Sequence, residues 1–257
     1  MDTQEASLKL LHSERTKKAI KPLTDSHSDL TVDQAYHTQL KTIRQKERDG
    51  AVIVGKKIGA TSKAIQDMFG VDKPDYGHLL DDMMFVEGET ISIGQFIQPK
   101  AEFEIAFMLK KDLDKENITT FDVIEATDFI VPAIEVIDSR IEDWKIKFED
   151  TVADNGSSAA AIIGTKPTQI EELDLIHLGM VAYKNGELLD SATGATVLGN
   201  PLRSVAWLAN SLRKYNVSLK AGEIILSGAL TSAVAIAAND TFTADFAHLG
   251  SISASFE

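Results

Sequence analysis

Residues 99–108 are the stretch around which the sequence is organised: Pro99-Lys100-Ala101-Glu102-Phe103-Glu104-Ile105-Ala106-Phe107-Met108. Apolar residues continue almost unbroken to Leu109, which predicts a buried strand. Because side chains alternate along a strand, Glu102 and Glu104 point to the same face. Two buried neighbouring carboxylates repel each other and lose hydration, so a hard divalent cation between them is the simplest explanation. The alternative is a half-exposed strand with two solvated glutamates, and this strand alone leaves both open.

Composition narrows the class of protein. The 257 residues are 44% hydrophobic, enough for one large domain or for one domain with a smaller appendage. A formal net charge of -13 argues against nucleic acid as a partner, since phosphate binding needs clustered Lys and Arg. The lack of cysteine excludes disulfides, Cys-ligated zinc, iron–sulfur clusters and a thiol nucleophile. No apolar run has the length of a membrane span and the N-terminus lacks a signal-peptide pattern, so we expect a cytoplasmic protein that handles small molecules without a membrane.

The first fifty residues differ in character from the rest. A helix is expected within residues 5–20, and Thr31 with Gln34 has the form of a capping box that begins an amphipathic helix. Asp49-Gly50 ends that helix. We therefore expect a small N-terminal helical lobe, residues 1–50, followed by a β-rich catalytic domain, residues 51–257.

The second part alternates short strands with a few helices. A strand is predicted over 51–60, a helix from Thr61 or Ser62 to Gly70, a turn-rich loop over 72–77 and a helix near 121–127. Residues 129–137 form a second buried run, and Pro132 predicts that it is an edge strand or near a strand start. Later signals are an Asn185-Gly186 hairpin, a helix opened by Asn200-Pro201, and short strands at 223–227, 233–237, 241–247 and 251–256. This pattern predicts an α+β fold.

Carboxylate side chains are the candidate functional groups that remain once the common sequence motifs have been excluded. No phosphate-binding glycine loop or nucleophile elbow is present, and the six histidines show no zinc-site pairing, although His78 deserves notice beside the 74–77 loop. Glu135 lies inside the second buried run and joins Glu102 and Glu104 as a candidate ligand. Three carboxylates without Cys or His favour Mg²⁺ or Mn²⁺ over zinc. For Glu135, a partly exposed edge position is the alternative.

Lys57 is the candidate acid or base. Its neighbours Gly55 and Gly59 leave room near the backbone. A partly desolvated lysine near a cation is expected to have a lowered pKa and to carry protons near neutrality. The alternative is that Lys56 and Lys57 are both solvated.

With these residues identified, the chain resembles the fumarylacetoacetate hydrolase superfamily, and within it the 2-keto-4-pentenoate (2-hydroxypenta-2,4-dienoate) hydratases and the 4-oxalocrotonate decarboxylases. The resemblance extends from about Leu30 to Phe256. It rests on several segments together: residues 57–63 (KIGATSK), 74–77 (PDYG), 99–106 (PKAEFEIA), 132–140 (PAIEVIDSR), 152–155 (VADN), 226–230 (LSGAL) and 249–252 (LGSI).

The resemblance implies a fold, a site and an assembly. The fold is a mixed β-roll with dimers as the basic unit, so a homo-oligomer is expected, with a complex with a sister hydratase or decarboxylase as a further expectation. The implied ligands of Mg²⁺ or Mn²⁺ are Glu102, Glu104 and Glu135, and the implied acid–base residues are Lys57 and Asp75. The substrate site would be lined by Ser157, Ser158, Gly228 and Ala229.

The implied activity is that of a lyase acting on a small 2-oxoacid or 2-hydroxydienoate. The leading hypothesis is hydration of 2-hydroxypenta-2,4-dienoate to 4-hydroxy-2-oxopentanoate in aromatic meta-cleavage catabolism; the rival is 4-oxalocrotonate decarboxylation with the same metal site. Residues 139–146 are closer to the hydratases, whereas residues 230–235 are closer to the decarboxylases. Ala60 and Gly156 stand where the family usually has Leu and Ala. Another 2-oxoacid reaction of the superfamily, such as oxaloacetate decarboxylation or acylpyruvate hydrolysis, and an inactive scaffold are the remaining alternatives.

Overall fold

The computed structural model describes residues 1–257 and contains seven α-helices and two β-sheets. The helices are α1 (Thr3–Thr16), α2 (Leu23–Ser26), α3 (Val32–Arg48), α4 (Lys63–Phe69), α5 (Thr120–Ala126), α6 (Phe148–Ala153) and α7 (Pro201–Leu212). None of them combines the length and apolar composition that crossing a lipid bilayer requires.

The larger sheet has eight strands and holds the sequence's two buried runs at its centre. Its order is β2-β1-β10-β5-β6-β7-β3, and β11 also pairs with β5. The strands are β1 (Ile53–Gly59), β2 (Asp75–Leu80), β3 (Met84–Val86), β5 (Lys100–Leu109), β6 (Thr127–Ile137), β7 (Ser158–Ile163), β10 (Ile224–Leu226) and β11 (Val234–Ala235).

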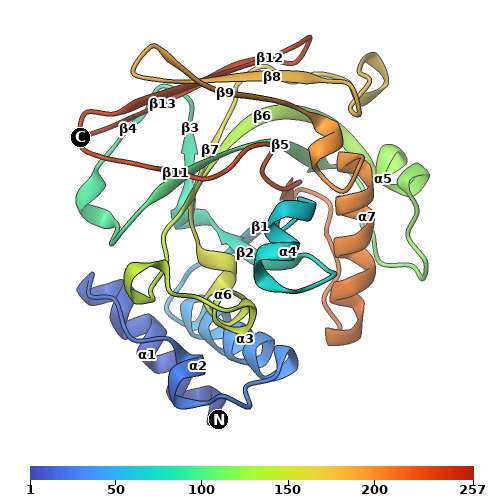
Figure 1. The fold of residues 1–257 in the computed structure, drawn as a ribbon. Helices are drawn as coiled ribbons and strands as arrows, with labels where there is room; N and C mark the ends of the chain where they lie inside the picture. The colour runs from blue at the N-terminus through green and yellow to red at the C-terminus, as the bar shows by residue number, and fades with distance from the viewer.

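The second sheet has five strands in the order β4-β13-β12-β8-β9. They are β4 (Thr90–Ile91), β8 (Gly179–Lys184), β9 (Glu187–Thr193), β12 (Thr241–Phe246) and β13 (Gly250–Phe256). In Figure 1 this sheet lies at the top and helices α1 to α3 at the bottom, with β1, β2 and α4 between them. The ring centroids of Phe103 and Phe242, one from each sheet, are 6.4 Å apart, so aromatic packing joins the two sheets.

Local signals set the ends of several helices as expected. The Thr31–Gln34 capping box begins α3. Ser62 caps α4, and Gly70 ends it in the left-handed conformation, with φ of 66°. Asn200 caps α7 ahead of Pro201. The Asn185-Gly186 turn joins β8 to β9 with positive φ at both residues, as a type I′ turn requires.

Two expectations about strands are wrong. Residues 75–77 of the expected turn-rich loop begin β2, because Asp75 to Leu80 pair with β1 over almost its whole length. Pro132 lies within β6, an interior strand between β5 and β7. The proline lies just beyond the last β6–β7 pair, Ala133 with Ile163, and against Gly164, which leaves room for its ring and donates its N–H to the Pro132 carbonyl oxygen at 3.0 Å.

Candidate active site

Three glutamates from the two central strands converge. The antiparallel register of β5 and β6 sets Glu102 directly opposite Glu135, while Glu104 follows on the same face of β5. One carboxylate oxygen from each lies within 4.8 Å of the others. Glu104 and Glu135 are fully buried, and Glu102 is partly exposed.

Three of the six carboxylate oxygens are buried without a hydrogen-bond donor. Glu104 Oε1 and both oxygens of Glu135 have no hydrogen-bond partner, while Glu104 Oε2 accepts from the backbone N–H of Gly228 at 2.7 Å. Buried unpaired carboxylate oxygens are costly, and three carboxylates aimed at one point make that cost larger. A divalent cation with oxygen ligands would satisfy them, so the triad fits such an ion.

The same crowding changes the acidity of the glutamates. Burial raises the pKa of Glu102 to about 7, with repulsion from Glu135 adding to it and Lys57 opposing it. Burial, together with repulsion from Glu135 and Glu102, raises the pKa of Glu104 well above its ordinary value. The pKa of Glu135 is also raised, chiefly by burial. Protons and cations therefore compete for this cluster near neutral pH.

Lys57 reaches the cluster from β1. Its Nζ lies 3.5 Å from Glu135 Oε2 and donates to the carbonyl oxygen of Gly156 at 3.1 Å, and the residue is 2% exposed. Burial lowers the pKa of Lys57, but attraction to Glu135, Asp75 and the other two glutamates outweighs burial, so the net pKa is raised. This direction holds for the amine among the carboxylates alone, so the lowering expected beside a bound cation stays a prediction.

Asp75 stands beside Lys57 because β2 pairs Asp75 with Gly59 of β1. A Cβ on Gly59 would lie 2.1 Å from Asp75 Oδ1 and 3.0 Å from Lys57 Nζ, so only glycine leaves room for both groups. Asp75 Oδ1 has no hydrogen-bond partner, and Thr151 donates to Oδ2 at 3.4 Å. Burial raises the pKa of Asp75, and Lys57 opposes that rise.

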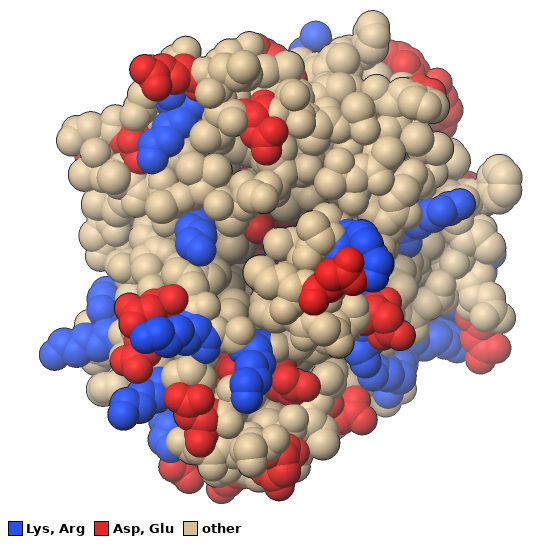
Figure 2. Space-filling view, viewed as in Figure 1, with Lys and Arg blue, Asp and Glu red and all other residues tan.

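A cavity of about 530 Å³ opens onto these groups. Figure 2 shows a hollow near the middle of this face with acidic atoms inside it, while most other charged side chains lie on the lower half. Of the residues expected in the site, Lys57, Asp75, Glu102, Ser157 and Ala229 line the cavity. Four expected residues lie behind this lining: Glu104, Glu135, Ser158 and Gly228. Ser158 lies beside Glu135, and Gly228 contacts Glu104 through its N–H.

One wall of the cavity was not expected from the sequence. It is apolar, and its members come from α4 and the 144–146 segment: Ile65, Met68, Phe69, Trp144 and Ile146. Lys100 also lines the cavity, with its Nζ 4.1 Å from the centre of the Trp144 ring. The position of Lys100, two residues before Glu102 on the same strand face, was a signal that could have found it. The apolar residues carried no such signal.

His78 is placed outside the cavity. It is buried, its Nδ1 lies 3.1 Å from Gln39 Oε1, and its backbone N–H donates to Asn155 Oδ1 at 2.7 Å. Burial, with the nearby Lys56 charge, lowers the pKa of His78 to about 3. Lys56 itself pairs with Glu223 at 2.6 Å, away from the site. Of the two adjacent lysines, only Lys57 faces the carboxylate cluster.

The fold and the acidic cluster agree with the comparisons with known proteins. The family described as "Fumarylacetoacetate (FAA) hydrolase C-terminal" matches residues 59–257, and the chain belongs to this family. Among its relatives, 2-hydroxyhexa-2,4-dienoate hydratase of Comamonas testosteroni is 45% identical over 250 residues, covering 96% of this chain and 95% of the relative. The 2-keto-4-pentenoate hydratase of Paraburkholderia xenovorans is 43% identical, with coverage of 99% and 94%.

A solved structure extends the comparison. The 4-oxalocrotonate decarboxylase from Pseudomonas putida G7, complexed with magnesium and adipate, superposes with a TM-score of 0.95 at 38% identity, covering 100% of this chain and 99% of that one. The expected α+β fold and family membership are thereby confirmed.

Proposed function

We propose that this protein is a divalent-metal-dependent hydratase of a 2-hydroxydienoate. The reaction is the addition of water to 2-hydroxypenta-2,4-dienoate, or a close homologue, to give 4-hydroxy-2-oxopentanoate or its homologue. The observation that carries the proposal is the buried cluster of three carboxylates with unpaired oxygens beside Lys57, of which Glu102 and Lys57 line a cavity. Hydratases of this substrate class at 43–45% identity support it.

Glu102, Glu104 and Glu135 would hold the metal, which we propose is Mg²⁺ or Mn²⁺. The all-carboxylate donor set favours these ions, and the decarboxylase neighbour is complexed with magnesium. When bound there, the ion supplies Lewis-acid polarisation of the substrate's 2-oxygen.

Lys57 and Asp75 would carry the protons. A proton must reach the carbon chain when the dienol becomes a ketone, and another must leave the water that adds to the enone. Lys57 Nζ is fixed by Gly156 and Glu135, and Asp75 Oδ1 is free of hydrogen bonds, so one donor and one acceptor face the cavity. We propose that Ser157 and Ala229 contact the substrate directly and that Ser158 and Gly228 support the ligands Glu135 and Glu104.

Decarboxylation of 4-oxalocrotonate is the second candidate. It is favoured by the 0.95 TM-score to a decarboxylase and by residues 230–235, of which 230–233 line the cavity. Both reactions require a stabilised enolate, so the three glutamates serve either one. The higher identities to hydratases place hydration first.

The test is an assay of the purified protein with each substrate, in EDTA and then with Mg²⁺ or Mn²⁺ restored. Loss of dienoate absorbance with formation of the hydroxy-oxoacid, abolished by EDTA, supports the hydratase. Release of CO₂ from oxalocrotonate at a higher kcat/KM overturns it in favour of the decarboxylase. Full activity in EDTA contradicts both.

We further propose that the protein acts in the cytoplasm as a homo-oligomer built from dimers, and that it forms a complex with a sister enzyme of the same pathway. The absence of cysteine is compatible with a reducing compartment. Light scattering of the purified protein tests the assembly: a monomeric mass at micromolar concentration would contradict it. Co-purification with a co-expressed sister enzyme tests the complex.

A further inference from the structure

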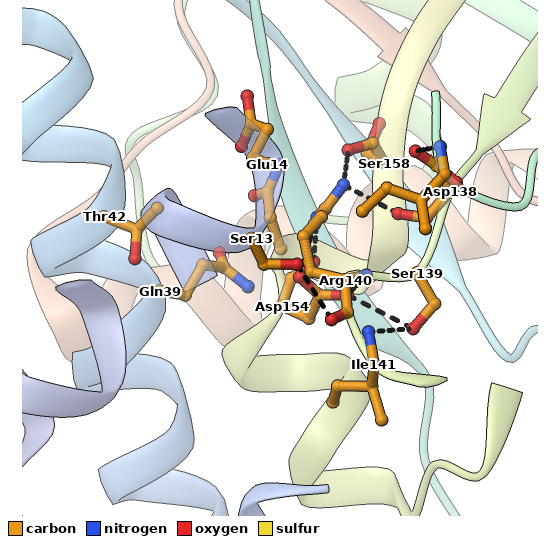
Figure 3. Close-up of polar contacts among 12 residues, drawn as sticks. Ser13, Glu14, Gln39, Thr42, Asp138, Ser139, Arg140, Ile141, Asp154 and Ser158 are labelled. Carbon is orange, nitrogen blue, oxygen red and sulfur yellow. Dashed lines mark hydrogen bonds and ion pairs between the residues drawn. The ribbon is translucent and has the colours of Figure 1, made fainter. Parts of the chain in front are cut away.

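A buried arginine outside the cavity holds the segment behind Lys57. Arg140 is 5% exposed and follows β6. Its Nε donates to Asp154 Oδ1 and its Nη2 to the Asp154 carbonyl oxygen, while Nη1 donates to the carbonyl oxygens of Asp138 at 2.8 Å and Ser158 at 3.0 Å (Figure 3). The planar guanidinium therefore hydrogen-bonds to both ends of the 154–158 segment at once, at Asp154 and at Ser158.

The segment it grips has an unfavourable backbone. Asn155, Gly156 and Ser157 have φ of 57°, 58° and 56°, so three successive residues are left-handed and two of them are not glycine. Such a run persists only when surrounding contacts impose it. At both ends of the segment these contacts are the hydrogen bonds from Arg140. In the middle, the Asn155 side chain accepts from the backbone N–H of His78 at 2.7 Å and donates to its carbonyl oxygen at 2.9 Å.

This run places two groups in the site. The Gly156 carbonyl oxygen accepts from Lys57 Nζ at 3.1 Å, and Gly156 and Ser157 line the cavity. Arg140 itself does not line it and has no hydrogen bond to any of the three glutamates. Its influence on the chemistry must therefore pass through the segment.

Helix α1 closes the other side of Arg140. Ser13 donates its hydroxyl to the Arg140 carbonyl oxygen at 3.1 Å (Figure 3). Glu14 lies near the guanidinium and pairs with Lys46. These contacts seal the arginine from solvent without touching residues 155–157. A substitution at Ser13 therefore provides a control, because it removes a contact of Arg140 without affecting residues 155–157.

We propose that Arg140, paired with Asp154, is a positioning residue of the active site: it imposes the left-handed run that sets the Gly156 carbonyl oxygen against Lys57 Nζ. The inference rests on the proposed function, which assigns proton transfer to Lys57. It assigns no direct contact with substrate or metal to Arg140.

The test compares Arg140→Lys and Asp154→Asn with two controls. Ser13→Ala removes a hydrogen bond to the Arg140 backbone only, and Glu223→Gln breaks another buried ion pair, Lys56–Glu223, which makes no contact with residues 154–158. For Arg140→Lys we expect kcat to fall about a hundredfold, as small misplacements of catalytic groups do. KM and the Kd for Mg²⁺ should change little, because the three glutamates keep their places. Asp154→Asn, which is more conservative toward folding, should show a smaller loss in the same direction.

Amide hydrogen exchange of the metal-free protein supplies a readout that does not need activity. Peptides covering residues 154–158 should exchange faster in Arg140→Lys and Asp154→Asn than in the wild type. The same peptides should exchange at the wild-type rate in the controls, when variants and controls are compared at equal loss of melting temperature. The proposal is overturned if kcat falls no more than in Glu223→Gln, if exchange in 154–158 is unchanged, or if exchange rises while kcat stays at the wild-type value. A wild-type protein inactive on both substrates would refute the proposed function. The exchange data would then still test whether the hydrogen bonds of Arg140 hold residues 154–158 in place.

Discussion

At the scale of single residues, Glu104 is the most exacting test of the metal site. Glu104→Gln keeps the shape of the side chain but removes one of three charges. We expect the Kd for Mg²⁺ to rise by more than about a hundredfold, since even outer-shell partners of a metal cost up to about that much, and turnover to fall with it. The metal-free variant should melt at a higher temperature than the wild type, because repulsion among buried carboxylates is relieved.

Isothermal titration with Mg²⁺, thermal melting and the hydratase assay measure these effects. Glu223→Gln is the matched control, as it neutralises a buried glutamate that pairs with Lys56 outside the cluster. Unchanged metal affinity in Glu104→Gln would remove this residue from the ligand set.

A substitution at Lys57 should impair proton transfer and leave metal binding intact. Lys57→Met retains the length of the stem and loses the amine that approaches Glu135. We expect kcat to fall by about 10²–10⁴-fold, the usual contribution of a general acid or base, with metal binding retained. Near-normal turnover in the same steady-state assay would exclude Lys57 from the mechanism.

At the scale of elements, the β1–β2 pair depends on a glycine. In Gly59→Ala the new Cβ would meet Asp75 Oδ1 at 2.1 Å, so the two strands or the Asp75 side chain must shift. We expect the variant to fold, with kcat reduced by about tenfold or more because Asp75 and Lys57 are displaced together. Gly179→Ala is the control, because its Cβ would meet no atom within 4 Å and it lies in the second sheet. Equal activity of the two variants would show that the close approach is unimportant.

The β5–β6 pair makes the stability of the metal-free protein depend on pH. The pKa of Glu102 is raised to about 7, and those of Glu104 and Glu135 are raised too, whereas a glutamate in an unfolded chain has a pKa of about 4.3. The folded state therefore holds these protons more tightly than the unfolded state. The resulting stability is complete below about pH 4 and is lost as pH rises through about 7.

We therefore expect the melting temperature in EDTA to fall between about pH 5 and pH 8, by about 2–4 °C for each kcal/mol lost. Mg²⁺ should remove most of the fall, because it binds the ionised carboxylates. Glu104→Gln should show a shallower slope, which separates the cluster from other buried acids such as Asp154. A wild-type slope in that variant would contradict the assignment.

At the scale of the whole molecule, the N-terminal helices are joined to the site by hydrogen bonds. Gln39 of α3 donates to the carbonyl oxygens of Tyr76 at 2.9 Å and Val152 at 2.7 Å, and its Oε1 lies 3.1 Å from His78 Nδ1. Removing residues 1–50 would leave these buried polar groups without partners, which is costly. The division into an N-terminal lobe, residues 1–50, and a catalytic domain, residues 51–257, therefore stays a prediction from the sequence.

We expect a fragment of residues 51–257 to lack cooperative unfolding and activity when expressed alone. Circular dichroism with a thermal melt measures this, and co-expression with residues 1–50 should restore both if the interface assembles in trans. A fragment that melts cooperatively and is active would show that the second part folds independently.

Much of the architecture follows from local sequence. The apolar run of β5, the capping residues Thr31 and Ser62 and the Asn185-Gly186 turn each act over a few residues, so their patterns were sufficient. The shared face of Glu102 and Glu104 follows from strand alternation alone.

Tertiary structure decided how these parts meet. The register of β5 against β6 brings Glu135 opposite Glu102, and the pairing of β2 with β1 brings Asp75 beside Lys57. The same long-range pairing places Pro132 in an interior strand and surrounds Lys57 with enough carboxylates to raise its pKa. The sequence by itself determined the candidates for the chemistry: side-chain type and periodicity, which are local, indicated Lys57 and the three glutamates, and the family resemblance added Asp75. Only the folded chain decided their distances and charges, because those depend on strand pairings between residues far apart in sequence.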